Sequence, residues 1–545
     1  MPSVARAGFH MRIFLLRKRP PASAPRGPRR SRWHPRRIVR HGLIAVIAIL
    51  AGLQLNAMRL GRPIYQANFR VPRVVERMPD PVAGQKIVVF APHEDDEAIG
   101  CATYMHRAVA VGADVHVVLL TNGDATELSV LYDEKTLRRR PKEFLYLGRK
   151  RQRETLEAMR AVGIAPDHVI FLGYPNNGLD RLWSPQFWYA GNPFRSPYTK
   201  AAFSPYENSY TPRTPYCGEA MVSDIRKVLM SLQPDTVFTV MPADIHRDHW
   251  PEWCFVVRAI AEVQQLQMPY RGPECVFTYL VHWPHWPAPR SYHPASPLCP
   301  PAALRAIPYM RWMQLPATPQ EVVDKHRTIS TYRTQGGRWT PVVTSFARTD
   351  ELFAAIEPAG IRERPAVAPA PGQGLAHPDV ETLIEDIAPG REKTLITPEY
   401  EVSQVSGVLD PRSLWLEVQT KRALPAGAAV AVTVVPCTWT DAGSVGPIVV
   451  KCTRSGVINV TRTVGGKTRQ ELPASIAFGI DDPIITLAMP REWLANTPAF
   501  ILSADVYSGN HLIDRAIWRL VYITAPRDAD DPLPPPGSVA NTVER

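Results

Sequence analysis

Apolar and polar positions change their period along this 545-residue chain, and the change divides it into regions. Between residues 84 and 355, short β-branched runs alternate with longer segments of helical period. This alternation is typical of an α/β domain with a Rossmann-like, doubly wound, mostly parallel sheet. The expected strands are 86–91, 114–121, 168–173, 235–240 and 276–281, and the expected helices are 97–111, 149–162, 218–232 and 250–264.

The second half of the chain has a different pattern. Residues 356–393 are rich in Pro, Ala and Gly, which predicts a linker. Residues 394–525 then contain short runs of period two separated by turn residues, the pattern of an all-β sandwich domain. This domain is either a carbohydrate-binding module or a spacer or assembly domain, and the pattern leaves both open. Residues 526–545 form a polar, Pro-rich tail that we expect to be disordered.

Charge adds a prediction about the N-terminal segment. Residues 1–40 contain twelve Lys and Arg and no acid, so this arm accounts for the whole net charge of +12. The basic charge is confined to the arm, so it does not indicate a nucleic-acid-binding protein. The arm is predicted to be disordered and cytoplasmic, because positive charge stays on that side of a membrane.

An uncharged, apolar run at 41–58 follows the arm and predicts a transmembrane signal-anchor or a signal peptide. The rest of the chain is then anchored to the inner membrane on its outer side, periplasmic or extracellular, or secreted if the run is cleaved. The alternative is a buried helix of a cytoplasmic domain.

Two clusters of polar residues follow predicted strands. The first is His93-Glu94-Asp95-Asp96-Glu97, after strand 86–91. His93 and Asp96, three residues apart across a strand-to-helix turn, can both reach one metal ion, which leaves Asp95 free to act as a base. Taken alone, the cluster is also compatible with an acidic helix N-terminus.

The second cluster, His246-Arg247-Asp248-His249, follows strand 235–240. Ligands in open α/β sheets bind at the carboxyl ends of the strands. A catalytic zinc takes three protein ligands and leaves one position for water. His249 can be the third ligand, and His246 a second imidazole in the site.

These two motifs resemble the signatures of the LmbE/PIG-L zinc-dependent N-deacetylases. The resemblance extends over about residues 84–345 and includes Arg151-Gln152-Arg153-Glu154 and Tyr332-Arg333-Thr334-Gln335. It implies zinc as the cofactor and a contribution of Arg151 to substrate binding. The sequence departs from the family at Glu94 and Arg247, where the family usually has Pro.

The predicted function is hydrolysis of the N-acetyl group of an amino sugar, in an extracytoplasmic glycan or glycoconjugate, by metal-activated water. Asp95 is the expected base, and His246 stabilises the oxyanion or protonates the leaving nitrogen. Asp248 is expected to orient an imidazole. Asp244 is a weaker candidate, because helix capping explains it equally well. Other divalent ions also suit a His/His/Asp set. The alternative function is a non-catalytic glycan-binding or assembly protein with the same fold.

Two further features carry open alternatives. The segment 176–216 is rich in aromatic residues, including Trp183 and Trp188, and forms either a wall or lid for sugars or a structural flap. If the domain is exported, disulfides are permitted. Cys437 could then pair with Cys452, and Cys275 with Cys299.

Overall fold

The computed structural model describes most of the chain after residue 74. Within the described ranges, no helix has both the length and the apolar composition needed to cross a membrane. The predicted arm at 1–40, the apolar run at 41–58 and the tail at 526–545 lie outside these ranges. The described residues are 75–127, 129, 140–266, 268–335, 341–365, 380–386, 400–440 and 443–524.

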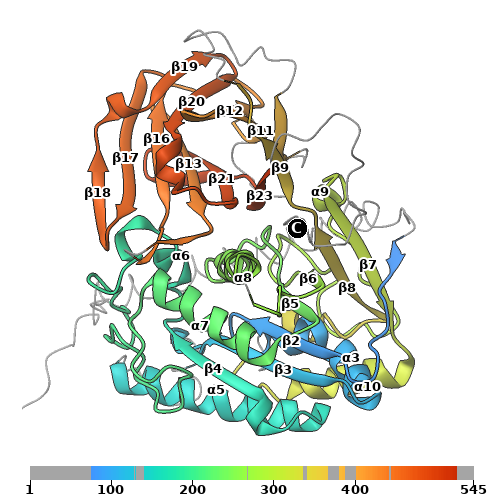
Figure 1. The fold of residues 1–545 in the computed structure, drawn as a ribbon. Coiled ribbons are helices and arrows are strands. Elements are labelled where there is room, and N and C mark those ends of the chain that lie inside the picture. Colours follow the sequence, from blue (N-terminus) through green and yellow to red (C-terminus); the bar gives the residue numbers. More distant parts are fainter. Residues whose placement is uncertain are drawn as a thin grey trace, which may run out of the picture. The chain divides into compact units, whose positions relative to one another are not determined.

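A mostly parallel sheet organises the first half of the described chain (Figure 1). The five neighbouring strands from β6 to the edge strand β4 pair in parallel, whereas β8 runs antiparallel to both of its neighbours. The predicted doubly wound α/β fold is therefore confirmed. In spatial order the strands are β1 (Glu76–Arg77), β7 (Met310–Pro316), β8 (Asp350–Ile356), β6 (Cys275–Tyr279), β5 (Thr236–Val240), β2 (Lys86–Ala91), β3 (Asp114–Thr121) and β4 (Val169–Tyr174).

Helices cover both faces of this sheet, and strand β2 shows why. Ile87 and Val89 pack into the core formed with α3 (Asp96–Ala110), α5 (Pro141–Val162) and α10 (Pro319–Ser330). Val88 and Phe90 pack into the core formed with α7 (Gly218–Leu232) and α8 (His249–Gln264). A parallel strand buried on both faces needs apolar residues at every position, which explains the continuous apolar run.

The chain order places the carboxyl ends of β2 and β5 side by side. From β2 the chain proceeds through β3 to β4 on one side, and then crosses to β5 on the other side of β2. This reversal is the topological switch point, where open α/β sheets bind their ligands. Both predicted polar clusters begin at this point.

The second half of the described chain forms two β-sheets that share one hydrophobic core, as expected for a sandwich. All described pairs in them are antiparallel except the parallel pair β23–β9. One sheet comprises β10 (Glu381–Glu385), β11 (Val402–Leu409), β12 (Ser413–Thr420), β20 (Ile484–Pro490) and β19 (Ala477–Asp481). The other comprises β18 (Lys467–Glu471), β17 (Gly456–Val464), β16 (Ile448–Thr453), β13 (Ala428–Pro436), β21 (Ala499–Ser508), β23 (Arg519–Thr524), β9 (Ala359–Arg362) and β22 (His511–Arg515), which pairs with β21.

The predicted linker at 356–393 is wrong where the structure describes it. Strand β9 pairs with β23, and strand β10 pairs with β11, so both belong to the sandwich. In β9, the side chains alternate: Ala359 and Ile361 are buried, and Gly360 and Arg362 are exposed. The Pro- and Gly-rich composition concealed these strands because each is only four or five residues long.

The two tryptophans of the aromatic segment 176–216 are buried, which favours the structural flap over a wall for sugars. Trp183 and Trp188 are 3% and 0% exposed. The Trp183 ring lies 4.8 Å from that of Phe255 in α8 and 6.0 Å from that of Trp518, just before β23. These rings therefore join the sandwich to helix α8 and do not present a free wall to a sugar.

All seven cysteines are free, so neither predicted disulfide is present. The register of the sandwich explains the first case. Cys452 in β16 lies opposite Val430 in β13, whereas Cys437 follows the end of β13.

Candidate metal centre

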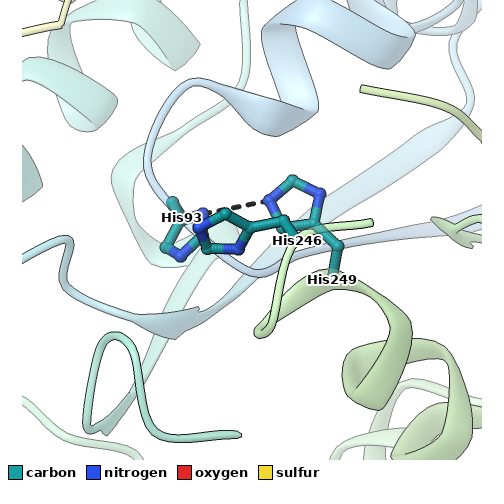
Figure 2. Close-up of side chains that lie close together, drawn as sticks. All are labelled: His93, His246 and His249. Carbon is teal, nitrogen blue, oxygen red and sulfur yellow. Dashed lines mark hydrogen bonds between the residues drawn. The ribbon is translucent and has the colours of Figure 1, made fainter. Parts of the chain in front are cut away.

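Three side-chain atoms face one another at the switch point. Helix α3 begins at Asp96, three residues after His93, and helix α8 begins at His249. The Nδ1 of His93 lies 3.1 Å from Oδ2 of Asp96 and 3.2 Å from Nε2 of His249. The third side, from His249 Nε2 to Asp96 Oδ2, is 3.3 Å. Figure 2 shows the two imidazoles facing each other, with His246 beside them.

This triangle fits a divalent cation. Two imidazole nitrogens and one carboxylate oxygen are a donor set that zinc prefers. The three atoms are nearly equidistant, so a single ion could contact all of them. All three residues are buried, with His93 the most exposed at 8%. The structure thus brings together His93, Asp96 and His249, the residues that the sequence predicted as ligands.

An outer carboxylate holds each imidazole. The Nε2 of His93 donates to Oδ2 of Asp248 over 3.0 Å, and the Nδ1 of His249 donates to Oδ2 of Asp244 over 3.1 Å. Each outer hydrogen bond orients its ring so that the inner nitrogen faces the triangle, where it can bind a metal once its proton is displaced.

Backbone amides fix both outer carboxylates in turn. Asp248 accepts hydrogen bonds from the N–H groups of Asn177 and Leu179. Asp244 accepts from those of His246, Val281 and His282. Asp244, a weak candidate in the sequence, therefore organises the loops that carry the imidazoles, and it does not cap α8, whose N-cap is Asp248.

These contacts shift the pKa values of the triangle. Burial alone would lower the pKa of His93, but hydrogen bonds with Asp248 and Asp96 raise it to about 9. Burial alone would raise the pKa of Asp96, but the charge of His249 and the hydrogen bonds from both imidazoles hold it well below its usual range. The carboxylates around the triangle thus stabilise positive charge on the imidazoles, and the same carboxylates would stabilise a metal cation.

Asp95 directly precedes the predicted ligand Asp96 and has a strained backbone. It is the N-cap residue of α3, with φ of 118°, in a region that non-glycine residues rarely occupy. Strain of this kind is typical of functional sites. Burial and the charges of Asp96 and Glu97 raise the pKa of Asp95 well above its usual value. A carboxyl group with a raised pKa is suited to accept a proton.

His246 lies at the edge of the triangle as a neutral ring. Burial, followed by the charges of His249 and His93, lowers its pKa to about 2. The backbone N–H of Asp248 donates to Nδ1 of His246 over 3.2 Å, so the ring proton sits on Nε2. His246 is therefore a hydrogen-bond donor at neutral pH and not a store of an additional proton.

His282 also lies at this site, although no motif in the sequence pointed to it. This residue follows β6, the neighbour of β5, and its ring centroid lies 4.6 Å from that of His249 and 5.0 Å from that of His246. Asp96, His249 and His282 also form a group whose ligand atoms lie within 4.8 Å of one another. The sequence feature that could have identified His282 is its position just after a third strand, β6, whose carboxyl end lies beside that of β5. The run of Trp and Pro residues that follows it resembles a structural loop.

Arg151 and the two residues that depart from the family pattern also lie around this site. The Nη1 of Arg151, in α5, donates to the carbonyl of Gly123 over 2.7 Å, and its Nη2 donates to Ser129 over 3.2 Å. Arg247 forms an ion pair of 2.8 Å with Asp180 of α6 (Leu179–Leu182) and so ties the second motif to the aromatic segment. Glu94 is fully buried.

Comparison with known proteins gives one family match. The family model described as GlcNAc-PI de-N-acetylase (PIG-L) matches residues 88–260. No curated protein matches the chain.

Several solved structures resemble part of the chain. A conserved protein from Thermus thermophilus is 20% identical, with 48% of this chain and 84% of that one covered, at a TM-score of 0.28. The N,N'-diacetylchitobiose deacetylase from Pyrococcus horikoshii is 17% identical, with 50% and 84% covered, at 0.32. The A40926 pseudoaglycone deacetylase is 13% identical, with 50% and 98% covered, at 0.29.

Proposed function

We propose that this protein removes N-acetyl groups from an amino sugar of a glycan or glycoconjugate, because residues 88–260 match the family model of the PIG-L de-N-acetylases. The observation that carries the proposal is the triangle of His93, Asp96 and His249, with its sides of 3.1–3.3 Å, beside the strained Asp95. Three ligands and an adjacent carboxylate are the minimum set for metal-assisted hydrolysis of an amide.

His93, Asp96 and His249 would hold the ion, for which zinc is the first candidate. A bound zinc supplies Lewis acidity, which makes water more acidic and polarises a carbonyl. Asp95 would accept the proton of the attacking water and later deliver it to the departing amine, because its carboxyl has a raised pKa and no competing ion pair shorter than 4.0 Å among the described residues.

His246 would stabilise the oxyanion. Its Nε2–H is the only proton on a neutral ring, and the nearby Nδ1 already accepts from the backbone of Asp248. Of the two roles expected from the sequence, donation of a hydrogen bond fits this tautomer better than transfer of a proton. Loss of a comparable donor in other hydrolases slows turnover by about 10²–10³-fold.

Acetate release tests the proposal. The purified chain should release acetate from at least one member of a panel of N-acetylated glycans, with bound metal measured on the same sample. The Asp95→Asn variant should keep its metal and lose rate by about 10²–10⁴-fold, because it removes only the base. A metal-loaded protein that binds glycans without releasing acetate would support the alternative, a non-catalytic glycan-binding or assembly protein.

We further propose that the catalytic domain acts outside the cytoplasm. The support is the basic arm at 1–40 followed by the uncharged apolar run at 41–58. Alkaline phosphatase fused after residue 80 should be active, because this reporter needs export. An inactive phosphatase, with an active cytoplasmic reporter fused at the same point, would refute the localisation and leave the chemistry untouched.

A further inference from the structure

A group of buried polar atoms next to His93 has no partner in the described part of the chain. Both carboxylate oxygens of Glu94 lack a hydrogen bond, and so do both side-chain atoms of the Asn122 amide. Oδ1 of Asp124 and Nε of Arg151 are in the same condition. All four residues are 3% exposed or less. Buried polar groups are almost always hydrogen-bonded, so a group of this size needs an explanation.

These residues meet around Gly123, in the loop after β3. A Cβ placed on Gly123 would lie 2.4 Å from Nη1 of Arg151 and 2.5 Å from Oε2 of Glu94. Gly123 thus leaves the space in which both side chains approach the loop. The charges of Arg151, His93 and Asp124 all act on the Glu94 carboxyl. The group therefore lies between β2 and β3, on the side of His93 away from β5.

The other atoms of this group are held firmly. Tyr206, from the aromatic segment, donates to Oδ2 of Asp124 over 2.5 Å, and Arg151 donates to Gly123 and Ser129. Asp124 and Arg151 are therefore held by these hydrogen bonds while Oδ1 of Asp124 and Nε of Arg151 stay without partners among the described residues. Leaving a buried carboxylate without donors is unfavourable. A small molecule rich in both donors and acceptors would satisfy the Glu94 and Asp124 acceptors, the Asn122 amide and the Arg151 N–H together.

We propose that Glu94 is a specificity-determining residue that accepts a hydrogen bond from a hydroxyl group of the substrate sugar, with Asn122 as its neighbour in this subsite. Because Glu94 directly follows the predicted ligand His93, the proposal places this hydroxyl on a carbon next to the one that bears the acetamido group, and C1 is excluded because it carries the glycosidic bond. This inference rests on the proposed function for its choice of a sugar. It adds that the protein requires a free hydroxyl at that carbon, C3 in N-acetylglucosamine.

A double-mutant cycle between protein and ligand tests the contact. Zinc-loaded full-length protein carrying Asp95→Asn, which suppresses turnover, is titrated by calorimetry with methyl N-acetylglucosaminide and with its 3-deoxy analogue. Addition of Glu94→Gln should weaken binding of the parent sugar by about 10-fold, because an amide oxygen is a weaker acceptor than a carboxylate oxygen. The same change should leave binding of the 3-deoxy sugar within about twofold.

Two variants guard the interpretation. Glu252→Gln is the matched control: Glu252 is equally buried and has one unpartnered oxygen, but it lies in α8 and binds Thr239. It should change binding of both sugars by the same factor. Asn122→Leu, of similar size, provides a second test of the subsite and should also weaken the parent sugar more than the 3-deoxy sugar. Thermal unfolding of each variant verifies that it is folded.

Equal losses for both sugars, or no loss, would overturn the role of Glu94 and leave a buried water as the partner of its carboxylate. Failure of the zinc-loaded protein to bind the parent sugar would also overturn it. Acetate release by the unmutated protein is measured separately. If the unmutated protein releases acetate but Glu94→Gln weakens both sugars equally, this inference alone is refuted. If Glu94→Gln weakens only the parent sugar but the unmutated protein releases no acetate, the proposed function alone is refuted.

Discussion

Two groups of His and Asp lie at opposite ends of the strands of one sheet and differ in the orientation of their rings and in the residues that hold them. His93, Asp96 and His249 follow the carboxyl ends of β2 and β5. Asp114, His116 and His168 lie where β3 and β4 begin, and their ligand atoms are also within 4.8 Å of one another. Asp114 Oδ1 lies 3.1 Å from Nε2 of His116 and 3.4 Å from Nδ1 of His168. By residue type and distance alone, both groups qualify as metal sites.

The rings separate the two groups. The imidazoles of His116 and His168 stack with centroids 4.1 Å apart and planes within 5°. The nitrogen lone pairs of two stacked imidazoles lie in two parallel planes, so they do not converge on one ion. Nδ1 of His168 is also engaged with the carbonyl of Val115. His93 and His249 are instead tilted by 44° and are held by Asp248 and Asp244. Convergence and an outer shell, more than proximity, therefore define the candidate metal centre.

The largest expected effect is the loss of metal and activity when a predicted ligand is replaced, compared with no loss in the other His/Asp group. His93→Ala, Asp96→Ala and His249→Ala should each remove the ion and abolish acetate release while the protein stays folded. His116→Ala and His168→Ala are the matched controls and should leave both properties unchanged. Metal content by plasma mass spectrometry and acetate release measure the outcome. Full metal occupancy in a ligand variant would exclude that residue from the set.

A smaller effect is expected in the outer shell. Asp248→Asn keeps a hydrogen-bonding group near Nε2 of His93 but removes the negative charge, so zinc affinity should fall by about 10–100-fold. Asp114→Asn makes the same change in the other group and should not alter zinc affinity. Competition with a chelator of known affinity measures both. Equal affinities for Asp248→Asn and the unmutated protein would show that this carboxylate does not support the metal.

The smallest step concerns pH. In the metal-free protein the pKa of His93 is raised to about 9, so a bound cation must displace its proton at neutral pH. Because the carboxylates of Asp244 and Asp96 raise the pKa of His249 as well, zinc affinity should increase by at least about tenfold per pH unit from pH 6.5 towards 9. Zinc titrations in chelator buffers across this range measure the slope. A flat profile would show that no proton is displaced at the site.

The fold of the catalytic half was readable from the sequence because its signals are local. Strand 86–91 and helix 218–232 were predicted with the boundaries that the structure has. Strands buried on both faces are continuous apolar runs, and each motif immediately follows such a run. The ligand residues followed from the same locality, since a parallel sheet brings all of its strand ends to one edge.

Other features depended on contacts between distant parts of the chain. His93 and His249 are 156 residues apart, so only the packed sheet could set the 3.2 Å between their nitrogens. The same packing brought His282 to the site, left the buried Glu94 carboxylate without a hydrogen bond among the described residues, and placed the Trp188 ring against Gly446, just before β16. The short strand β9 likewise gains its strand partner, β23, from a distant part of the chain. The sequence by itself thus determined which residues stand at each strand end, and tertiary structure decided which of them face one another, because convergence of side chains is a property of packing.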